Sequence, residues 1–191
     1  MLTRRFEEAL VYATRLHAEQ TRKGSAIPYV SHLMAVAALT LEYGGSEDQA
    51  IAALLHDAVE DQGGAETRAE IEQRFGAAIA AIVDGCTDTD QHPKPPWRKR
   101  KQAYIEQIRT APPSVRLVAA CDKLHNARSL AKDYRVCGEA LWDRFSGGRE
   151  GTLWYYRSIV EALRCNGPDP LVDEVDRAVR QLESLADGGV D

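Results

Sequence analysis

Two histidines and two aspartates recur in order along this chain and are the residues best suited to hold a metal ion. His32 comes first, the adjacent pair His56 and Asp57 follows 24 residues later, and Asp122 lies 65 residues beyond that pair. Each lies in an otherwise apolar segment, where an imidazole or a carboxylate is costly to bury unless a cation compensates. Two nitrogen and two oxygen donors suit manganese, iron, zinc or nickel. Such an ion lowers the pKa of a bound water toward ~7 and so creates a nucleophile for hydrolysis.

Two further carboxylates, Glu60 and Asp61, follow one helical turn after the central pair. Residues four apart on a helix lie one above the other. A helix through this segment therefore places His56 and Glu60 on one stripe and Asp57 and Asp61 on the next, within a sector of roughly 140°. We expect Glu60 and Asp61 to transfer protons or to orient the attacking water.

Taken singly, several of these residues have simpler explanations. His32 at a helix start could be a cap or a packing residue, and Asp122 could form a buried salt bridge with Arg116 or Lys123. A lone His-Asp pair is also common. The ordered set, with every member in a mostly apolar segment, favours the metal site.

Apolar residues recur every three or four positions over most of the chain, which is the period of a helix with one buried face. Ser31 and Ser46 are placed to cap the helices that follow them. No segment has strong strand alternation, so we expect an all-α fold, a bundle of about eight to ten helices. The expected helices cover residues 5–20, 31–43, 46–60, 67–75, 77–84, 97–110, 114–132, 136–145, 150–164 and 171–185.

The length of 191 residues suits one domain. We expect a single domain over 1–191, with its core at 6–163. The C-terminal helix, at 168–187, either closes that core or pairs with a second subunit in a homo-oligomer.

Composition restricts the partners and the location of the protein. No apolar run reaches the ~18 residues that a membrane span needs. The net charge of -5 shows no basic excess, which argues against a nucleic acid polymer as partner. The four cysteines lie far apart and form no CxxC pair, which indicates reduced thiols and a cytoplasmic protein.

The order of the four candidate ligands resembles that of the HD-domain phosphohydrolases. Three local segments resemble the hydrolase domain of RelA/SpoT homologues: the RK pair at 22–23 followed by PYVSH at 28–32, LLHDAVED at 54–61, and DKLHN at 122–126. The likeness covers most of the chain. Because the sequence shows no synthetase region, it is similar to the stand-alone small alarmone hydrolases.

This resemblance implies an HD-domain helical bundle and a manganese-dependent hydrolase that removes the 3′-pyrophosphate from an alarmone nucleotide such as ppGpp. It implies that Glu60 and Asp61 are the catalytic pair. It also implies that His32, His56, Asp57 and Asp122 are the metal ligands, that Arg22 and Lys23 flank the base, that Asn126 contacts the ribose, and that Ser129 lies near the base.

Two positions depart from the family pattern. Leu33 stands where many relatives have proline after the ligand histidine, which affects only the helix start. Ser129 stands where bifunctional members have threonine, so an adenine alarmone such as pppApp or ppApp stays an alternative substrate to ppGpp and pppGpp.

A substrate with several phosphates also needs cations, and the densest basic run, 97–101, opens a predicted helix. Lys101 is the member best placed to face inward, whereas Arg98, Lys99 and Arg100 cannot all do so; a solvated helix face is the simpler alternative. On a later helix the resemblance implies a tyrosine that faces the substrate, and we take Tyr155 over Tyr156 for this role. Packing of these rings in the core is the simpler alternative.

Two other functions stay open. One is an HD-type phosphohydrolase that acts on another nucleotide, similar to a 5′-nucleotidase. The other is a nucleotide-sensing module without catalysis, which is disfavoured because no candidate ligand is lost.

Overall fold

The computed structural model describes residues 1–89, 93–167 and 169–188. These residues form ten α-helices and one 3-10 helix, η1, and their only β-pairing is an isolated bridge between Thr21 and Pro28. The predicted all-α fold is therefore confirmed. The elements are α1 (Arg4–Leu16), α2 (Val30–Glu42), α3 (Glu47–Leu55), α4 (Ala58–Gln62), α5 (Gly64–Phe75), α6 (Ala77–Cys86), α7 (Trp97–Thr110), α8 (Pro113–Cys137), η1 (Gly138–Arg144), α9 (Gly148–Arg164) and α10 (Pro170–Ala186).

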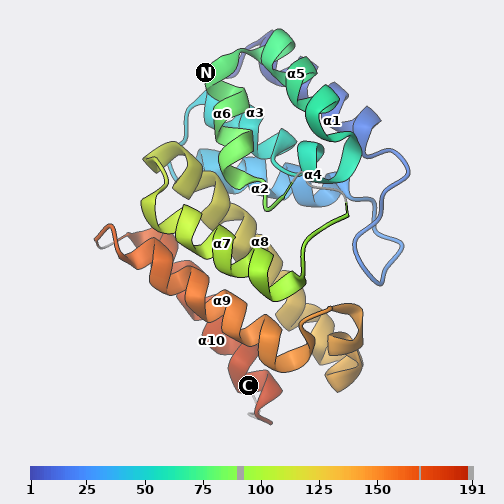
Figure 1. Ribbon diagram of the computed structural model, residues 1–191, viewed down its shortest axis with the longest axis vertical. Helices are drawn as coiled ribbons and strands as arrows, with labels where there is room; N and C mark the ends of the chain where they lie inside the picture. The colour runs from blue at the N-terminus through green and yellow to red at the C-terminus, as the bar shows by residue number, and fades with distance from the viewer. Residues whose placement is uncertain (90–92, 168, 189–191) are drawn as a thin grey trace.

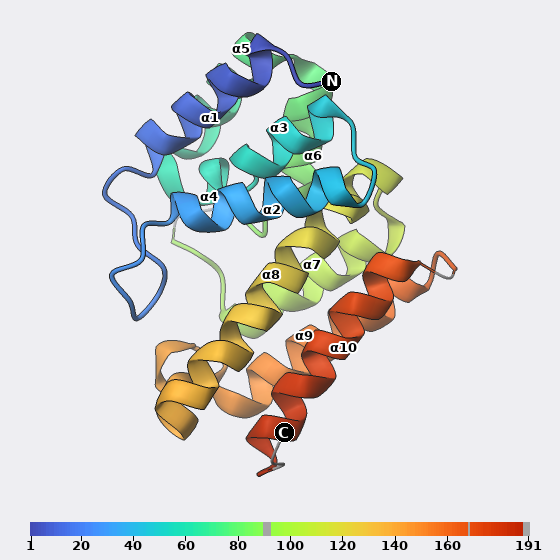
Figure 2. The same cartoon turned by 180° about the vertical axis from the view of Figure 1, so that it is seen from behind.

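Helix α8 is the element that the two halves of the molecule share. Helices α1 to α6 form one half, and α7, α9 and α10 lie in the other (Figure 1). Along its length α8 packs against α2, α3 and α6 and then against α10 and α9. Seen from behind, α10 runs beside α8 over much of its length (Figure 2). The middle of α8, which carries Asp122, therefore lies where both halves meet.

The segment 46–60 does not form the continuous helix that we predicted. It begins as expected, because Ser46 and Gln49 form a reciprocal capping box. Helix α3 then ends at Leu55, and His56 and Asp57 form a turn before the short α4. The His56 ring contacts the Ala53 carbonyl oxygen at 2.8 Å, and this contact accompanies the break in the helix. The prediction of two aligned stripes on one helix is therefore wrong.

Several other predicted boundaries are also wrong. The first helix ends at Leu16 and not at residue 20, and α8 continues to Cys137, past the predicted end at residue 132. Helix α2 begins at Val30, one residue before Ser31, and its N-cap Tyr29 makes no side-chain cap bond. The predicted helix at 136–145 is a 3-10 helix, because Gly138 ends α8 with a φ of 56°. A left-handed residue of this kind favours glycine and stops an α-helix.

The apolar stripe of α10 is buried within its own chain, since Leu171, Val175, Val179 and Leu182 are all shielded from solvent. The assignment of the chain to a single domain, with its core at 6–163, stays a prediction. Among the described residues, no helix is both long and apolar enough to cross a bilayer.

Candidate metal centre and its cavity

The fold brings the four candidate ligands together from three places in the chain. His32 lies on α2, His56 and Asp57 form the turn between α3 and α4, and Asp122 lies on α8. The Oδ2 atom of Asp57 is 3.0 Å from Nε2 of His56 and 3.6 Å from Nε2 of His32. The Oδ1 atom of Asp122 is 3.2 Å from Nε2 of His32 and 3.6 Å from Nε2 of His56. Two ring nitrogens and two carboxylate oxygens thus converge on one point, and His32, His56 and Asp57 alone already form a group able to hold a metal ion.

The two histidines are oriented as metal-binding histidines are. Nδ1 of His56 donates to the Ala53 carbonyl oxygen, 2.8 Å away, so Nε2 is the ring nitrogen directed at the carboxylates. Burial lowers the pKa of His56, but the negative charges of Asp57 and Asp122 outweigh it and raise that pKa, and a metal ion would take the place of the Nε2 proton. Both rings are buried, and in the described part of the chain neither Nε2 atom has a hydrogen-bond partner. Buried polar atoms are rarely left in this way, so the donor set fits a divalent ion.

The two carboxylates are kept ionised by their neighbours. Burial raises the pKa of the Asp122 carboxyl, but the positive charge of Lys123 and the two histidines outweigh it and hold that pKa well below its usual range. Nζ of Lys123 lies 2.6 Å from Oδ2 of Asp122. Asp57 is likewise held well below its usual pKa against the effect of burial, chiefly by His56, and it accepts a 2.6 Å hydrogen bond from the Tyr29 hydroxyl.

Glu60 and Asp61 lie beside this cluster on α4, although not on the helical stripes that we predicted. Both side chains line the adjacent cavity. Gln20 donates a 2.8 Å hydrogen bond to Asp61, and Lys94 forms a 2.9 Å ion pair with Glu60. The pKa of Asp61 is raised because the protein displaces solvent around its carboxyl group and because Asp57 is negatively charged. Asp61 therefore takes up a proton at a higher pH than a solvent-exposed aspartate does.

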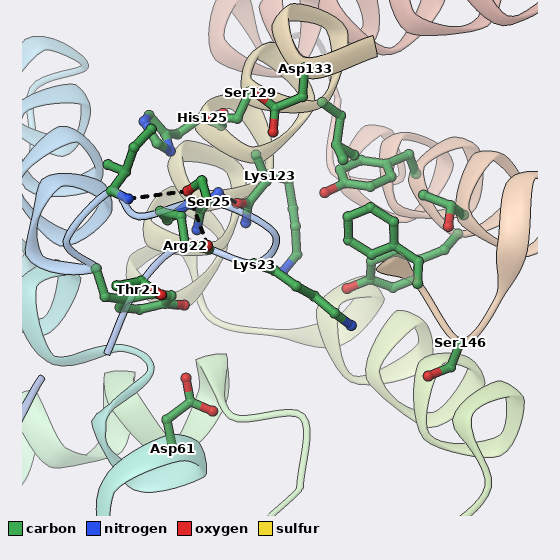
Figure 3. A pocket seen from close by; sticks show the side chains of 18 of the residues that line it. Thr21, Arg22, Lys23, Ser25, Asp61, Lys123, His125, Ser129, Asp133 and Ser146 are labelled. Atoms are coloured by element: carbon green, nitrogen blue, oxygen red, sulfur yellow. Dashed lines mark hydrogen bonds between the residues drawn. The ribbon is translucent and has the colours of Figure 1, made fainter. Parts of the chain in front are cut away.

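A cavity of about 710 Å³ lies beside the cluster, between the loop after α1, the helix α8 and the start of α9. None of the four candidate ligands lines it, but Tyr29 and Lys123, which contact Asp57 and Asp122, do. Asp61, Lys123 and Ser146 reach it from different elements, as Figure 3 shows. Nη2 of Arg22 donates to Oδ1 of Asn126 at 2.6 Å, which ties the loop to α8. All six residues that we predicted to contact substrate line this one cavity: Arg22, Lys23, Asn126, Ser129, Lys101 and Tyr155.

The basic run at the start of α7 divides between cavity and solvent. Arg100 and Lys101 line the cavity, whereas Lys99 is exposed and Arg98 packs over the ring of Trp154, 3.2 Å from its centroid. On α9 the structure brings both Tyr155 and Tyr156 to the cavity. From the sequence we take Tyr155 over Tyr156, and the structure gives both tyrosines a place on the cavity wall.

Some residues at the site had no predicted role in binding or catalysis. The sequence predicts Lys123 only as a salt-bridge partner of Asp122; that ion pair is present, and Lys123 also lines the cavity. Tyr29 belongs to the PYVSH segment, and its hydroxyl bonds to Asp57. Asp133 and Phe145 also line the cavity, but no recognisable pattern in the sequence marks either residue.

Comparisons with known proteins point in one direction. Residues 9–152 match the family described as HD domain. The chain is 38% identical over 168 residues to guanosine-3′,5′-bis(diphosphate) 3′-pyrophosphohydrolase MESH1 of Homo sapiens, a match that covers 82% of this chain and 89% of that protein. It is 34% identical over 149 residues to the bifunctional (p)ppGpp synthase/hydrolase SpoT of Escherichia coli K12, covering 72% of this chain but 20% of SpoT.

Two solved structures share the fold. One, described as a metazoan ortholog of SpoT that hydrolyzes ppGpp, superposes with a TM-score of 0.78 at 28% identity and covers 95% of this chain and 97% of that chain. The other is a crystal structure from Listeria monocytogenes EGD-e, with a TM-score of 0.68 at 31% identity, covering 83% of this chain and 99% of that one.

Proposed function

This chain belongs to the HD-domain family and is homologous to a stand-alone small alarmone hydrolase, and from this premise we propose that it is a metal-dependent alarmone 3′-pyrophosphohydrolase. The observation that carries the proposal is the convergence of two buried Nε2 atoms, neither of which forms a hydrogen bond, with two carboxylates whose partners Tyr29 and Lys123 line an adjacent cavity. That cavity also contains the catalytic candidates Glu60 and Asp61.

His32, His56, Asp57 and Asp122 are the proposed ligands, and Mn²⁺ is the proposed ion, although the same donors suit other divalent transition metals. A bound ion of this kind supplies activation of water and neutralises charge on a phosphate. His32 and His56 would contribute neutral ring nitrogens to a bound ion, Tyr29 orients Asp57 by its hydrogen bond, and Lys123 keeps Asp122 ionised.

In the proposed reaction, the oxygen of a water molecule forms a bond to the phosphorus attached to the ribose 3′-oxygen, and the bond between that phosphorus and the 3′-oxygen breaks. Asp61, with its raised pKa, accepts a proton from the water. Glu60 orients the water, and a proton is returned to the 3′-oxygen that leaves. From ppGpp the products are GDP and inorganic pyrophosphate.

The rest of the cavity provides the proposed substrate contacts. Arg22 and Lys23 flank the base, Asn126 contacts the ribose, and Ser129 lies near the base. Lys101 and Tyr155 face the phosphates. The proposed substrates are ppGpp and pppGpp or their adenine analogues, and the four free cysteines are consistent with action in the cytoplasm.

A substrate panel tests this function. The manganese-loaded protein is incubated with ppGpp, pppApp and simple 5′-nucleotides, and orthophosphate and pyrophosphate are measured separately. Pyrophosphate from an alarmone supports the proposal. If both alarmones stay intact while a 5′-nucleotide loses orthophosphate, the protein is a different nucleotidase; tight alarmone binding without turnover indicates a sensor.

A further inference from the structure

Asp88 follows the end of α6 and is the shared acidic partner of two cations on the cavity wall. Its Oδ2 atom lies 2.7 Å from Nζ of Lys101 and also accepts a hydrogen bond from Nη1 of Arg100. The Asp88 side chain is only 6% exposed. Its second oxygen, Oδ1, is buried and has no hydrogen-bond partner within the described residues. One buried carboxylate oxygen therefore holds both cations.

These two cations are fixed more firmly than their neighbours in the basic run. Nε of Arg100 also donates to the Pro95 carbonyl oxygen at 3.1 Å, and Nζ of Lys101 lies 4.9 Å from the centroid of the Tyr155 ring. Adjacent positive charges repel each other, and long side chains lose rotamer freedom when they are held in place. A shared counter-ion offsets both effects. Arg100 and Lys101, the two members of the basic run that contact Asp88, are also the two that line the cavity.

We infer that Asp88 is a positioning residue for substrate binding: it holds Arg100 and Lys101 against the cavity wall so that both present their charges to a diphosphate group. Asp88 does not line the cavity and acts only through the two cations. The inference rests on the proposed function for its substrate, an alarmone, and it applies equally to inorganic pyrophosphate.

The sign of one mutational effect separates this role from simple electrostatics. Replacing Asp88 by asparagine removes a negative charge near an anion site, so electrostatics alone predicts tighter binding of a diphosphate. Loss of positioning predicts weaker binding, because two mobile cations must be ordered when the ligand binds. The two explanations therefore predict opposite changes in KM.

The test compares Asp88→Asn with Asp84→Asn in the metal-loaded protein. Asp84 is a matched control, because it also pairs with an arginine, Arg68, but is 43% exposed and lies outside the cavity. For Asp88→Asn we expect KM for ppGpp, and the inhibition constant of inorganic pyrophosphate at constant free Mn²⁺, to rise by roughly 10-fold or more. We expect kcat to change far less, and Asp84→Asn to leave both constants unchanged.

A second set of variants distinguishes loss of positioning from misfolding of the variant protein. Asp88→Glu keeps the charge and should give a smaller rise in KM at an unchanged melting temperature. In an Arg100→Met/Lys101→Met background, Asp88→Asn should have no further effect on KM, because the residues through which it acts are gone. If KM falls or stays constant in Asp88→Asn, or if kcat alone falls, the inference is wrong.

Failure of the proposed function would be visible separately. If the wild-type protein does not cleave alarmones, calorimetry with inorganic pyrophosphate still measures the binding step. Weaker pyrophosphate binding by Asp88→Asn would then support the role of Asp88 while the alarmone activity is rejected. Equal pyrophosphate binding by both proteins, or none by the wild type, would overturn the role of Asp88.

Discussion

His125 lies directly behind His32, with the two Nδ1 atoms 2.8 Å apart. Nε2 of His32 faces the carboxylates of Asp57 and Asp122, so an ion bound there requires the His32 proton to be on Nδ1. His125 must then accept that proton in a hydrogen bond. Burial and the neighbouring His32 lower the pKa of His125 to about 4, so its ring is neutral near pH 7 and can accept. His125 thereby fixes the tautomer of His32.

His125, the fourth residue of the DKLHN segment, should therefore influence metal affinity. Replacing His125 with leucine removes the acceptor, and we expect the dissociation constant for Mn²⁺ to rise roughly 10- to 100-fold. Titration of the metal-free protein, followed by the electron paramagnetic resonance signal of free Mn²⁺, measures this change. His125→Asn is the control, because its amide oxygen can still accept. Equal affinity in the leucine variant would show that the contact has no influence on the metal.

Metal binding should also stabilise the fold, because the ligand set is assembled only in the folded chain. At a free Mn²⁺ concentration about 100 times its dissociation constant, the gain is about 2.7 kcal/mol, or a melting temperature about 5 to 10 °C higher. Thermal unfolding with and without a chelator measures it. Asp122→Asn should abolish the increase, whereas Asp84→Asn should keep it. An increase that survives in Asp122→Asn would place the ion elsewhere.

Substitution of the catalytic pair should lower turnover without removing the metal ion. Glu60→Gln and Asp61→Asn keep the shape of each side chain but remove its ability to exchange a proton, so we expect kcat to fall by about 10²- to 10⁴-fold. Elemental analysis should find the wild-type metal content in both variants. Glu66→Gln, on the exposed face of α5, is the control and should retain full activity. Loss of the ion together with activity would make these carboxylates ligands instead.

The pH dependence of the reaction should report on Asp61. Its pKa is raised by its surroundings and by Asp57, and Gln20 opposes this by donating to the ionised carboxylate. A base acts in its ionised form, so kcat/KM is highest above the pKa of Asp61 and falls as the pH drops through it. Gln20→Leu removes the opposing hydrogen bond and should move this acid limb to higher pH. An acid limb that stays in place would exclude Asp61 as the base.

Much of the site was predictable because it depends on local sequence. The helical period predicted the all-α fold, and α7 begins and ends at the predicted residues, where prolines flank it. The four candidate ligands were identifiable because polar groups in apolar helices need a compensating partner.

Other features depend on contacts between distant segments and could not be predicted. The segment before His56 consists of good helix formers, and nothing in it marks the turn that separates α3 from α4. Asp88 belongs to a polar loop, and its importance appears only when α7 brings Arg100 and Lys101 beside it.

The most direct test of the proposed activity follows the oxygen of the attacking water. The manganese-loaded protein is incubated with ppGpp in water enriched in ¹⁸O, the reaction is stopped with chelator, and the products are separated and analysed by mass spectrometry. We predict equal amounts of GDP and pyrophosphate, with one ¹⁸O atom in the pyrophosphate, none in the GDP, and no reaction when chelator is present from the start. Intact ppGpp at full metal occupancy, or release of orthophosphate alone, would contradict the proposed function.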